Sequence, residues 1–247
     1  MPRYFLEVAY KGTNYAGFQK QQNANSIQSE VEKALSTFFR TEYNLTGSSR
    51  TDAGVHAKQN FFHFDCEQLL SQKNFTKVIY HINAILPLDI VVQSIKEVNP
   101  GSHCRFDALS RTYEYIVYQN KNPFLQDRAY YYPYNLDINL LQQLAVEIMN
   151  HTDFESFAKR NTQVHTFFCT IFQSEWIFNE NYLIFRITAN RFLRGMVKGL
   201  VGTMLRLASK NESIIQFHSI ILSKNPSMVD FAVPSHGLTL QNVNFKL

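Results

Sequence analysis

Cysteine is scarce in this chain of 247 residues. Cys66, Cys104 and Cys169 form no CxxC pair and are odd in number, which argues against a disulfide framework and a structural zinc site. With 9 glycines and 7 prolines, the chain is neither collagen-like nor of low complexity. No apolar run reaches the roughly 18 residues of a membrane helix, and the charged N-terminal segment lacks a signal-peptide core. These absences predict a cytoplasmic protein with no membrane segment and no metal.

The rest of the composition is that of a packed globular protein, with 45% hydrophobic and 18% charged residues. The length suits one large domain or two small ones. Lysine and arginine number 24 against 20 acidic residues, which gives a net charge of +4. This mild excess allows a nucleic-acid partner without requiring one.

Hydrophobic periodicity predicts two halves with the same order of elements. In the first half we expect strands at 3–10, near 43–45, at 59–65 and near 89–95, with helices at 26–39 and near 75–84. Asn25 and Gln28 have the spacing of a capping box for the first helix. In the second half we expect strands at 111–120, 169–178, 182–189 and 238–247, with helices at 137–150 and 191–207.

Both halves therefore follow the order β-α-β-β-α-β, which is typical of ferredoxin-like (RRM-like) folds. The predicted class is α+β, with two such halves whose antiparallel sheets form a central cleft. We expect the domains to span residues 1–102 and 103–247.

The loop Arg50-Thr51-Asp52-Ala53-Gly54 is the first candidate site, because functional side chains often lie on loops between strands. Arg50 could keep the Asp52 carboxylate ionised, and Gly54 would let a large ligand approach the backbone. Asp52 could equally be an ordinary turn residue that bonds nearby amides. His56 is more typical of a hydrogen-bonded, half-buried histidine than of a base.

The predicted helix 191–207 is the second candidate. Its helical projection places Arg191, Arg194 and Lys198 beside three glycines, on the side opposite the apolar face. Six basic residues and no acidic one lie between Asn181 and Asn211, as expected of a surface that contacts phosphates. A solvated basic face with glycine-mediated packing is the alternative.

Arg111–Tyr115 is the third candidate, because Tyr113 and Tyr115 share one face of an alternating strand. They could stack on an exposed base, or they could belong to the core.

Seven ordered motifs together resemble the bacterial tRNA pseudouridine synthase A family across nearly the whole chain. They are Tyr15–Gln21 (YAGFQKQ), Ser49–Ala57 (SRTDAGVHA), Asn83–Ile90 (NAILPLDI), His103–Ala108 (HCRFDA), Arg111–Tyr115 (RTYEY), Asp153–Phe157 (DFESF) and Phe192–Gly202 (FLRGMVKGLVG). The RTDAGVHA element is the most specific of them.

The resemblance implies an isomerase that converts uridine to pseudouridine at positions 38, 39 and 40 of the tRNA anticodon stem-loop. Asp52 matches the family's catalytic nucleophile, and Lys198 stands where the family has an arginine that pairs with it. Tyr113 matches the tyrosine that stacks on the uracil, and Arg50 would hold the flipped nucleotide out of its stack. The family implies no cofactor and no metal, and its members work as homodimers.

Three other functions remain open at this stage. The chain could be a synthase of the same fold with a different RNA target, or a non-catalytic RNA-binding protein. It could also be a small-molecule enzyme that uses Asp52 as an acid or base. Salt dependence separates this last alternative, because binding through phosphates weakens with salt.

Overall fold

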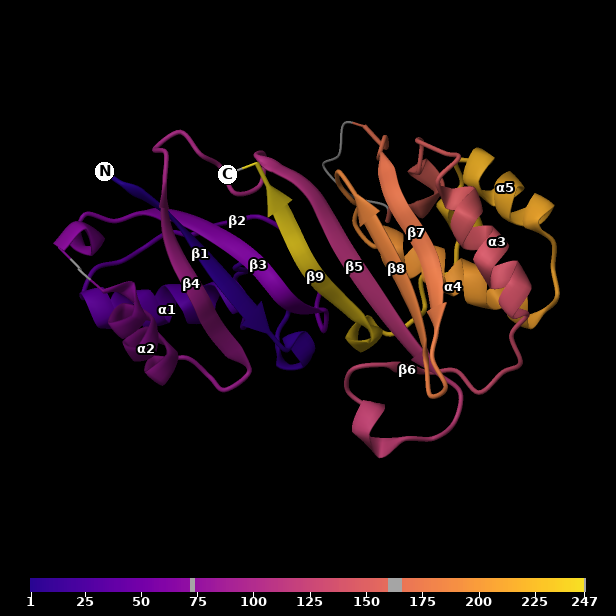
Figure 1. Ribbon diagram of the computed structural model, residues 1–247, viewed down its shortest axis with the longest axis horizontal. Coiled ribbons are helices and arrows are strands. Elements are labelled where there is room, and N and C mark those ends of the chain that lie inside the picture. The colour runs from indigo at the N-terminus through magenta and orange to yellow at the C-terminus, as the bar shows by residue number, and fades with distance from the viewer. Residues whose placement is uncertain (72–73, 160–165, 247) are drawn as a thin grey trace. The chain divides into compact units, whose positions relative to one another are not determined.

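The computed structural model describes residues 1–71, 74–159 and 166–246, which form an α+β fold with mostly antiparallel strands, as predicted (Figure 1). The chain divides into two compact units, Met1–Leu109 with Leu240–Leu247, and Ser110–Thr239. Residues 240–247 cluster with the first unit. Among the described residues, no helix is both long and apolar enough to cross a bilayer.

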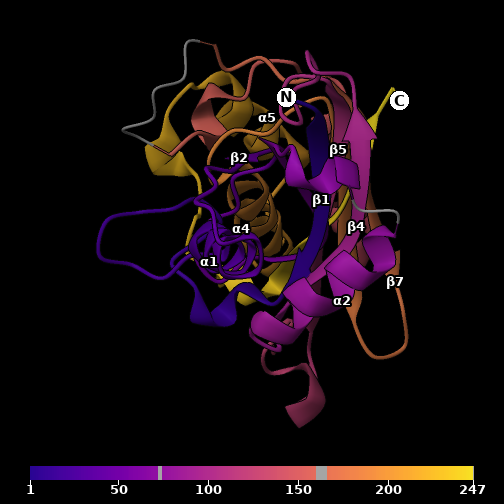
Figure 2. The same ribbon diagram turned by 90° about the vertical axis from the view of Figure 1, so that its left-hand side faces the viewer.

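The first unit contains most of the elements expected for its half. They are β1 (Arg3–Tyr10), α1 (Ile27–Phe39), β2 (Thr46–Gly47), β3 (His56–Asp65), α2 (Phe75–Ile85) and β4 (Ile90–Val98). Strand β1 lies between β4 and β3 and is antiparallel to both. Helices α1 and α2 pack against each other, and α2 packs on β4 (Figure 2). The strand expected near 43–45 is instead the short β2, which pairs with β3.

Strand β1 buries one of its faces completely and the other in part. Tyr4, Leu6 and Val8 alternate along one face and are fully buried. Phe5, on the other face, is only 3% exposed and contacts the ring of Phe245 from β9 (Leu238–Phe245). Glu7 follows Phe5 on this second face and is half-buried, so only the first face is wholly apolar.

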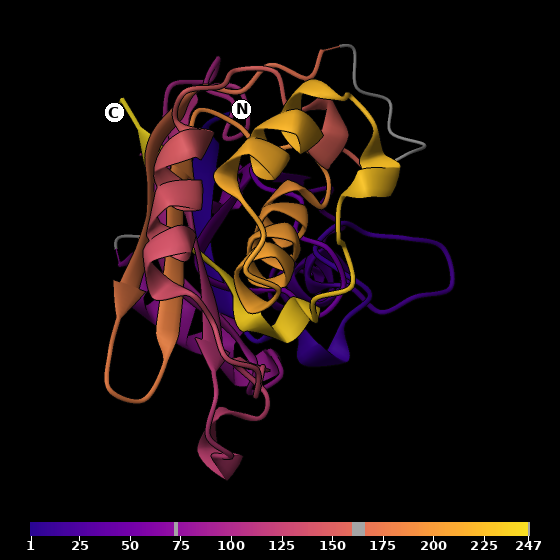
Figure 3. The ribbon, with the colours of Figure 1, turned by 90° about the vertical axis from the view of Figure 1, so that its right-hand side faces the viewer.

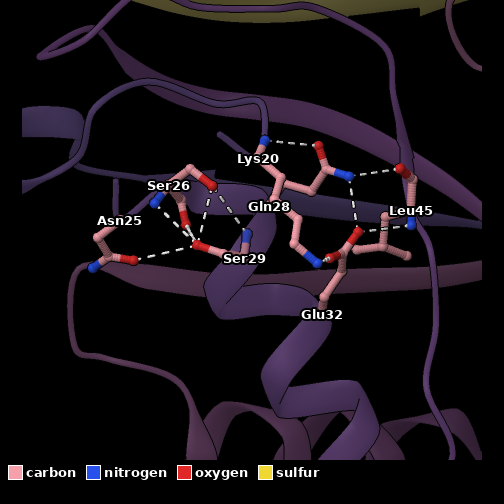
Figure 4. Close-up of polar contacts among 7 residues, drawn as sticks. All are labelled: Lys20, Asn25, Ser26, Gln28, Ser29, Glu32 and Leu45. Atoms are coloured by element: carbon pink, nitrogen blue, oxygen red, sulfur yellow. Dashed lines mark hydrogen bonds and ion pairs between the residues drawn. The ribbon is translucent and has the colours of Figure 1, made fainter. Parts of the chain in front are cut away.

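Helix α1 begins at Ile27, one residue later than predicted. Ser26, with extended backbone angles, is the N-cap, and its hydroxyl accepts a hydrogen bond from the amide of Ser29 (Figure 4). The Ser29 hydroxyl accepts in return from the Ser26 amide, which completes a capping box. The predicted box of Asn25 and Gln28 is therefore wrong, because Asn25 lies outside the cap.

The Gln28 and Glu32 side chains instead connect α1 to the loops on either side of it (Figure 4). Glu32 is 5% exposed and accepts from Lys20 Nζ at 2.9 Å and from the Leu45 amide at 3.0 Å. Gln28 Nε2 donates to the same carboxylate and to the Leu45 carbonyl. The buried charge is thus well provided with donors.

In the part of the chain that the structure describes, the second unit contains one strand and one helix that its sequence pattern did not predict. Its elements are β5 (Ala108–Tyr118), β6 (Tyr130–Tyr131), α3 (Ile138–Ile148), β7 (Ile171–Phe178), β8 (Leu183–Ala189), α4 (Met196–Ser209) and α5 (Ile214–Leu222). The hairpin of β7 and β8 is confirmed, and β8 also pairs antiparallel with β5, the strand that enters this unit. Helix α3 packs on β7 and contacts α4 and α5 (Figure 3).

Helix α5 escaped prediction although Ser213 caps it in the usual way. The short strand β6 falls in the segment that was expected to be a loop, and it pairs parallel with β5. Helix α4 begins at Met196 rather than Arg191, because Gly195 adopts a left-handed φ of +74° at its N-cap. Arg191 and Arg194 therefore precede the helix and do not form its basic face.

Candidate active site

Buried hydrogen bonds hold the RTDAG loop between β2 and β3. The Tyr10 hydroxyl on β1 lies 2.8 Å from Thr51 Oγ1, and Asn60 Nδ2 on β3 donates to the Tyr10 hydroxyl at 3.2 Å. Asn60 also donates to the Ser49 carbonyl and accepts from the Ser49 amide. The loop is therefore fixed immediately before Asp52 from two neighbouring strands.

Close backbone approaches reinforce this fixation from residues 12–17. A Cβ at Gly12 would lie 2.0 Å from the Val55 carbonyl oxygen, so no side chain fits there. Gly17 has a φ of +114°, and its Cβ would lie 3.0 Å from the Thr51 carbonyl oxygen. The motif 15–21 and the motif 49–57 are thus parts of one packed structure.

Asp52 and Arg50 differ in their exposure on this loop. Asp52 is half-buried, and its carbonyl accepts from the Val55 amide at 3.2 Å, which makes the turn expected of this segment. Arg50 is exposed. The positive φ of Gly54 (+78°) belongs to the same turn. A half-buried carboxylate on a fixed turn can act as a nucleophile or a base.

His56, by contrast, has the structural role that the sequence favoured. It is 6% exposed, and its Nδ1 accepts a hydrogen bond from the Gly12 amide at 3.0 Å. That bond uses the ring nitrogen lone pair that a general base would need at this atom.

Tyr113 and Tyr115 lie on β5 in the second unit, and both are buried. Tyr115 is fully buried and donates to the Pro234 carbonyl at 2.7 Å, so its core assignment is correct. Tyr113 is 9% exposed, and its ring meets Phe192 edge-on at 5.1 Å between centroids. Phe192 comes from the FLRG motif, so two of the quoted motifs meet here.

Lys198 lies in the first turn of α4, half-buried, and its Nζ donates to Ser235 Oγ at 3.2 Å. That turn contains no acidic residue, and Gly195 at the N-cap offers no side-chain acceptor. The positive end of the helix dipole adds to the lysine charge. The side chain therefore sits in a place that favours an anion. Ser235 was not recognised from the sequence, because no motif includes it.

The glycines of α4 are explained by packing, which is the alternative that the sequence left open. A Cβ at Gly202 would lie 2.3 Å from the Asp230 carbonyl oxygen, and one at Gly199 would lie 2.8 Å from the Phe231 ring. Both glycines are buried under residues 229–231. Gly202 is thus approached by the backbone of Asp230, and Gly199 by the side chains of Phe231 and Val229.

The basic residues between 181 and 211 do not form one continuous surface. Arg186 is paired with Glu114 across β8 and β5 at 2.7 Å, and Arg206 with Glu212 at 3.5 Å. Arg194 and Lys210 are exposed. A phosphate surface in this region therefore rests on fewer cations than the sequence count suggested.

The four candidate side chains thus lie in two places, Arg50 and Asp52 in the first unit and Tyr113 and Lys198 in the second. The family model described as tRNA pseudouridine synthase matches residues 7–107 and 145–246, which include Asp52 and Lys198. The chain belongs to this family.

Relatives in the tRNA pseudouridine synthase family align with almost the entire chain. A protein named tRNA pseudouridine synthase A from Azobacteroides pseudotrichonymphae is 39% identical over 99% of this chain and 97% of its own length. One of the same name from Bacteroides fragilis is 39% identical over 98% and 96%. A Staphylococcus aureus protein of that name is 32% identical over 98% and 90%. The chain is therefore a pseudouridine synthase by family, an isomerase.

Proposed function

We propose that this chain isomerises uridine to pseudouridine at positions 38, 39 and 40 of the tRNA anticodon stem-loop, with Asp52 as nucleophile. The observation that carries the proposal is Asp52 itself, which lies in the family's RTDAG element on a loop fixed by Tyr10 and Asn60. A nucleophile needs such fixed geometry, since a displacement of about 1 Å can cost a hundredfold in rate.

The reaction exchanges one bond to the ribose for another. The N1–C1′ glycosidic bond breaks, the uracil turns, and C5 bonds to C1′. The proton at C5 leaves and N1 takes up a proton, so atoms and charge balance. Asp52 attacks the sugar carbon or the base, and its carboxylate must be ionised to do so. No cofactor is required by this sequence of steps.

Lys198 is proposed to pair with the Asp52 carboxylate. Its position in the first turn of α4, without acidic neighbours in that turn, supports this role. Lysine offers a point charge where arginine would offer a planar fork, so the pair would lack bidentate geometry.

Tyr113 is proposed to stack on the uracil and to assist loss of the C5 proton. Its low exposure and its contact with Phe192 support a fixed platform. Arg50, which is exposed, is proposed to hold the target nucleotide out of its stack. Extrusion of the base costs a few kcal/mol, which contacts of this kind must offset.

The finer fold and assembly proposals follow from the family. We propose two ferredoxin-like halves around a cleft that receives the uridine. The order β-α-β-β-α-β of the first unit, with β1 between β3 and β4, supports this for that unit. We also propose that the protein is a homodimer. We propose a cytoplasmic location, in line with three buried cysteines that form no disulfide.

The test is tritium release from unmodified tRNA that contains [5-³H]uridine, because formation of pseudouridine expels the C5 hydrogen. Wild type is expected to release tritium and Asp52→Asn to release none, with tRNA binding retained. Asp127→Asn, which changes a carboxylate elsewhere whose side chain is 45% exposed, is the matched control and is expected to match wild type. Mapping of the product positions tests the three uridines.

Three results would overturn the proposal. Release by Asp52→Asn at the wild-type rate would remove Asp52 from the chemistry. Binding without release by wild type would leave a different RNA target or a non-catalytic RNA-binding protein. Activity on a small molecule, insensitive to salt, would favour the third alternative.

A further inference from the structure

A carboxylate and two imidazoles converge between α3 and α5, on residues that no motif of the family includes. Glu147 lies near the end of α3, His151 follows that helix, and His218 lies on α5. His151 Nε2 is 2.8 Å from Glu147 Oε1, and His218 Nδ1 is 2.9 Å from the same oxygen. The three donor atoms lie within 4.8 Å of one another.

These distances are close to those of a metal centre. Zinc binds histidine nitrogen at about 2.0–2.1 Å and carboxylate oxygen at about 2.0–2.2 Å, which places tetrahedral ligand atoms roughly 3.3 Å apart. Both nitrogen–oxygen distances here are shorter by only a few tenths of an ångström. Small side-chain rotations would therefore admit an ion, without movement of either helix.

The surroundings also suit a cation. Asn150 Nδ2 donates to the other oxygen of Glu147 at 3.0 Å, so Oε1 is aimed at the histidines. Glu147 therefore presents Oε1 to the two imidazoles while Asn150 holds the second oxygen.

Exposure differs across the cluster in the way an open coordination site requires. The side chains of His151 and Glu147 are 10% and 16% exposed, whereas that of His218 is 49% exposed. The cluster is therefore closed on the helix side and open to solvent beside His218. An ion there would keep a position for water.

We propose that Glu147, His151 and His218 form a binding site for one divalent transition-metal ion of the zinc class. Two imidazoles and one carboxylate are a donor set that zinc prefers, whereas calcium and magnesium prefer oxygen ligands throughout. The bound ion connects the end of α3 to α5 and stabilises this packing. The site is separate from the isomerase chemistry, which needs no metal.

A cluster held by hydrogen bonds alone is the competing explanation, because each neutral imidazole could donate one proton to Oε1. Direct measurement of metal binding distinguishes the hydrogen-bonded cluster from the metal site. The test titrates chelator-treated full-length protein with Zn²⁺ by calorimetry, and with Co²⁺ by visible absorption. The expected result is one ion per chain, with the d–d spectrum of a low-coordinate Co²⁺ site. A thermal shift of several degrees should accompany zinc at a hundredfold over its Kd.

Matched variants assign the site. His218→Ala and Glu147→Gln should each weaken zinc binding by at least about tenfold, and Asn150→Ala by on the order of tenfold. Glu147→Gln keeps the size of the side chain, and circular dichroism confirms folding of each variant. His81→Ala, at an exposed histidine in the first unit, should bind as wild type does.

Three outcomes would overturn the proposal. Wild-type affinity in both His218→Ala and Glu147→Gln would mean that zinc binds elsewhere. Equal weakening by His81→Ala and His218→Ala would indicate dispersed binding to surface histidines. Absence of saturable binding to wild type would favour the hydrogen-bonded cluster.

Discussion

The Tyr10 hydroxyl lies 2.8 Å from Thr51 Oγ1, and both residues are at most 8% exposed. This bond joins the central strand of the first unit to the residue immediately before Asp52. Burial raises the pKa of Tyr10 far above its ordinary value, so the hydroxyl stays protonated and remains a donor. The position of the proposed nucleophile thus depends on the core of the sheet.

Tyr10→Phe should lower both stability and activity. It removes the hydroxyl between Thr51 and Asn60, and a buried polar group without its partner costs about 1–3 kcal/mol. We expect a loss of that size in the free energy of unfolding, measured in urea, together with a lower kcat for tritium release. Tyr80→Phe is the control, because Tyr80 is 70% exposed. Equal effects of the two variants would contradict the role of the buried bond.

Gly202→Ala should destabilise the second unit. The new Cβ would lie 2.3 Å from the Asp230 carbonyl oxygen, which is backbone and cannot rotate away. Overpacking of this kind costs about 1–3 kcal/mol, although alanine favours the helix by roughly 1 kcal/mol over glycine. Gly101→Ala, with no atom within 4 Å of its Cβ, should leave the unfolding midpoint unchanged or slightly raised. A wild-type midpoint for Gly202→Ala would show that residues 229–231 can move aside.

Acid should destabilise the first unit through His63. Burial lowers the pKa of this histidine from 6.5 to about 4, with help from His103 and Arg3, and its Nδ1 lies 3.3 Å from the Cys104 amide that donates to it. The unfolded chain therefore takes up a proton below pH 6.5 that the folded chain takes up only near pH 4. Stability from this group is complete above pH 6.5 and falls as the pH drops toward 4, by at most about 3 kcal/mol.

Urea unfolding of wild type and His63→Gln between pH 4 and 7.5 measures this effect. Glutamine keeps an acceptor for the Cys104 amide but does not titrate. The difference in unfolding free energy between the two proteins should change with pH in the window from 6.5 to 4. A difference that stays constant across this window would exclude His63 as the cause.

Substitutions of Lys198 test its proposed role as the charge partner of Asp52. Loss of one electrostatic contact to a reacting group typically lowers kcat about 10²–10³-fold, so Lys198→Ala should fall in this range. Lys198→Arg should retain activity, because it restores the residue usual in the family. Lys210→Ala, at an exposed lysine just past α4, should behave as wild type in single-turnover assays. Full activity of Lys198→Ala would remove the lysine from the mechanism.

Elements with a strong local pattern were predictable from the sequence. β1 alternates regularly, the β7–β8 hairpin has turn residues between two apolar runs, and α2 has a clear helical period. Candidate site residues could be proposed from the sequence too, because the RTDAG loop and Tyr113 lie in specific motifs. Each of these depends on residues adjacent in the chain.

The beginning of α4 and the cluster on α3 and α5 were not predictable in this way. The helical spacing of apolar residues continues on both sides of Gly195 in the sequence, but the left-handed φ of Gly195 makes the helix begin only after it. Glu147 and His151 have the spacing of one helical turn, but His218 comes from α5, 71 positions after Glu147. No local sequence pattern predicts a contact between residues so far apart in the chain.

The sequence by itself determined the α+β class, the family and the place of Asp52 in the RTDAG element, because short-range periodicity and ordered motifs encode them. Tertiary structure decided what surrounds those residues. It placed Tyr10 and Asn60 against the RTDAG loop, residues 229–231 over the glycines of α4, and a carboxylate against two histidines. These are long-range contacts, whose geometry depends on the packing of whole elements rather than on the spacing of residues along the chain.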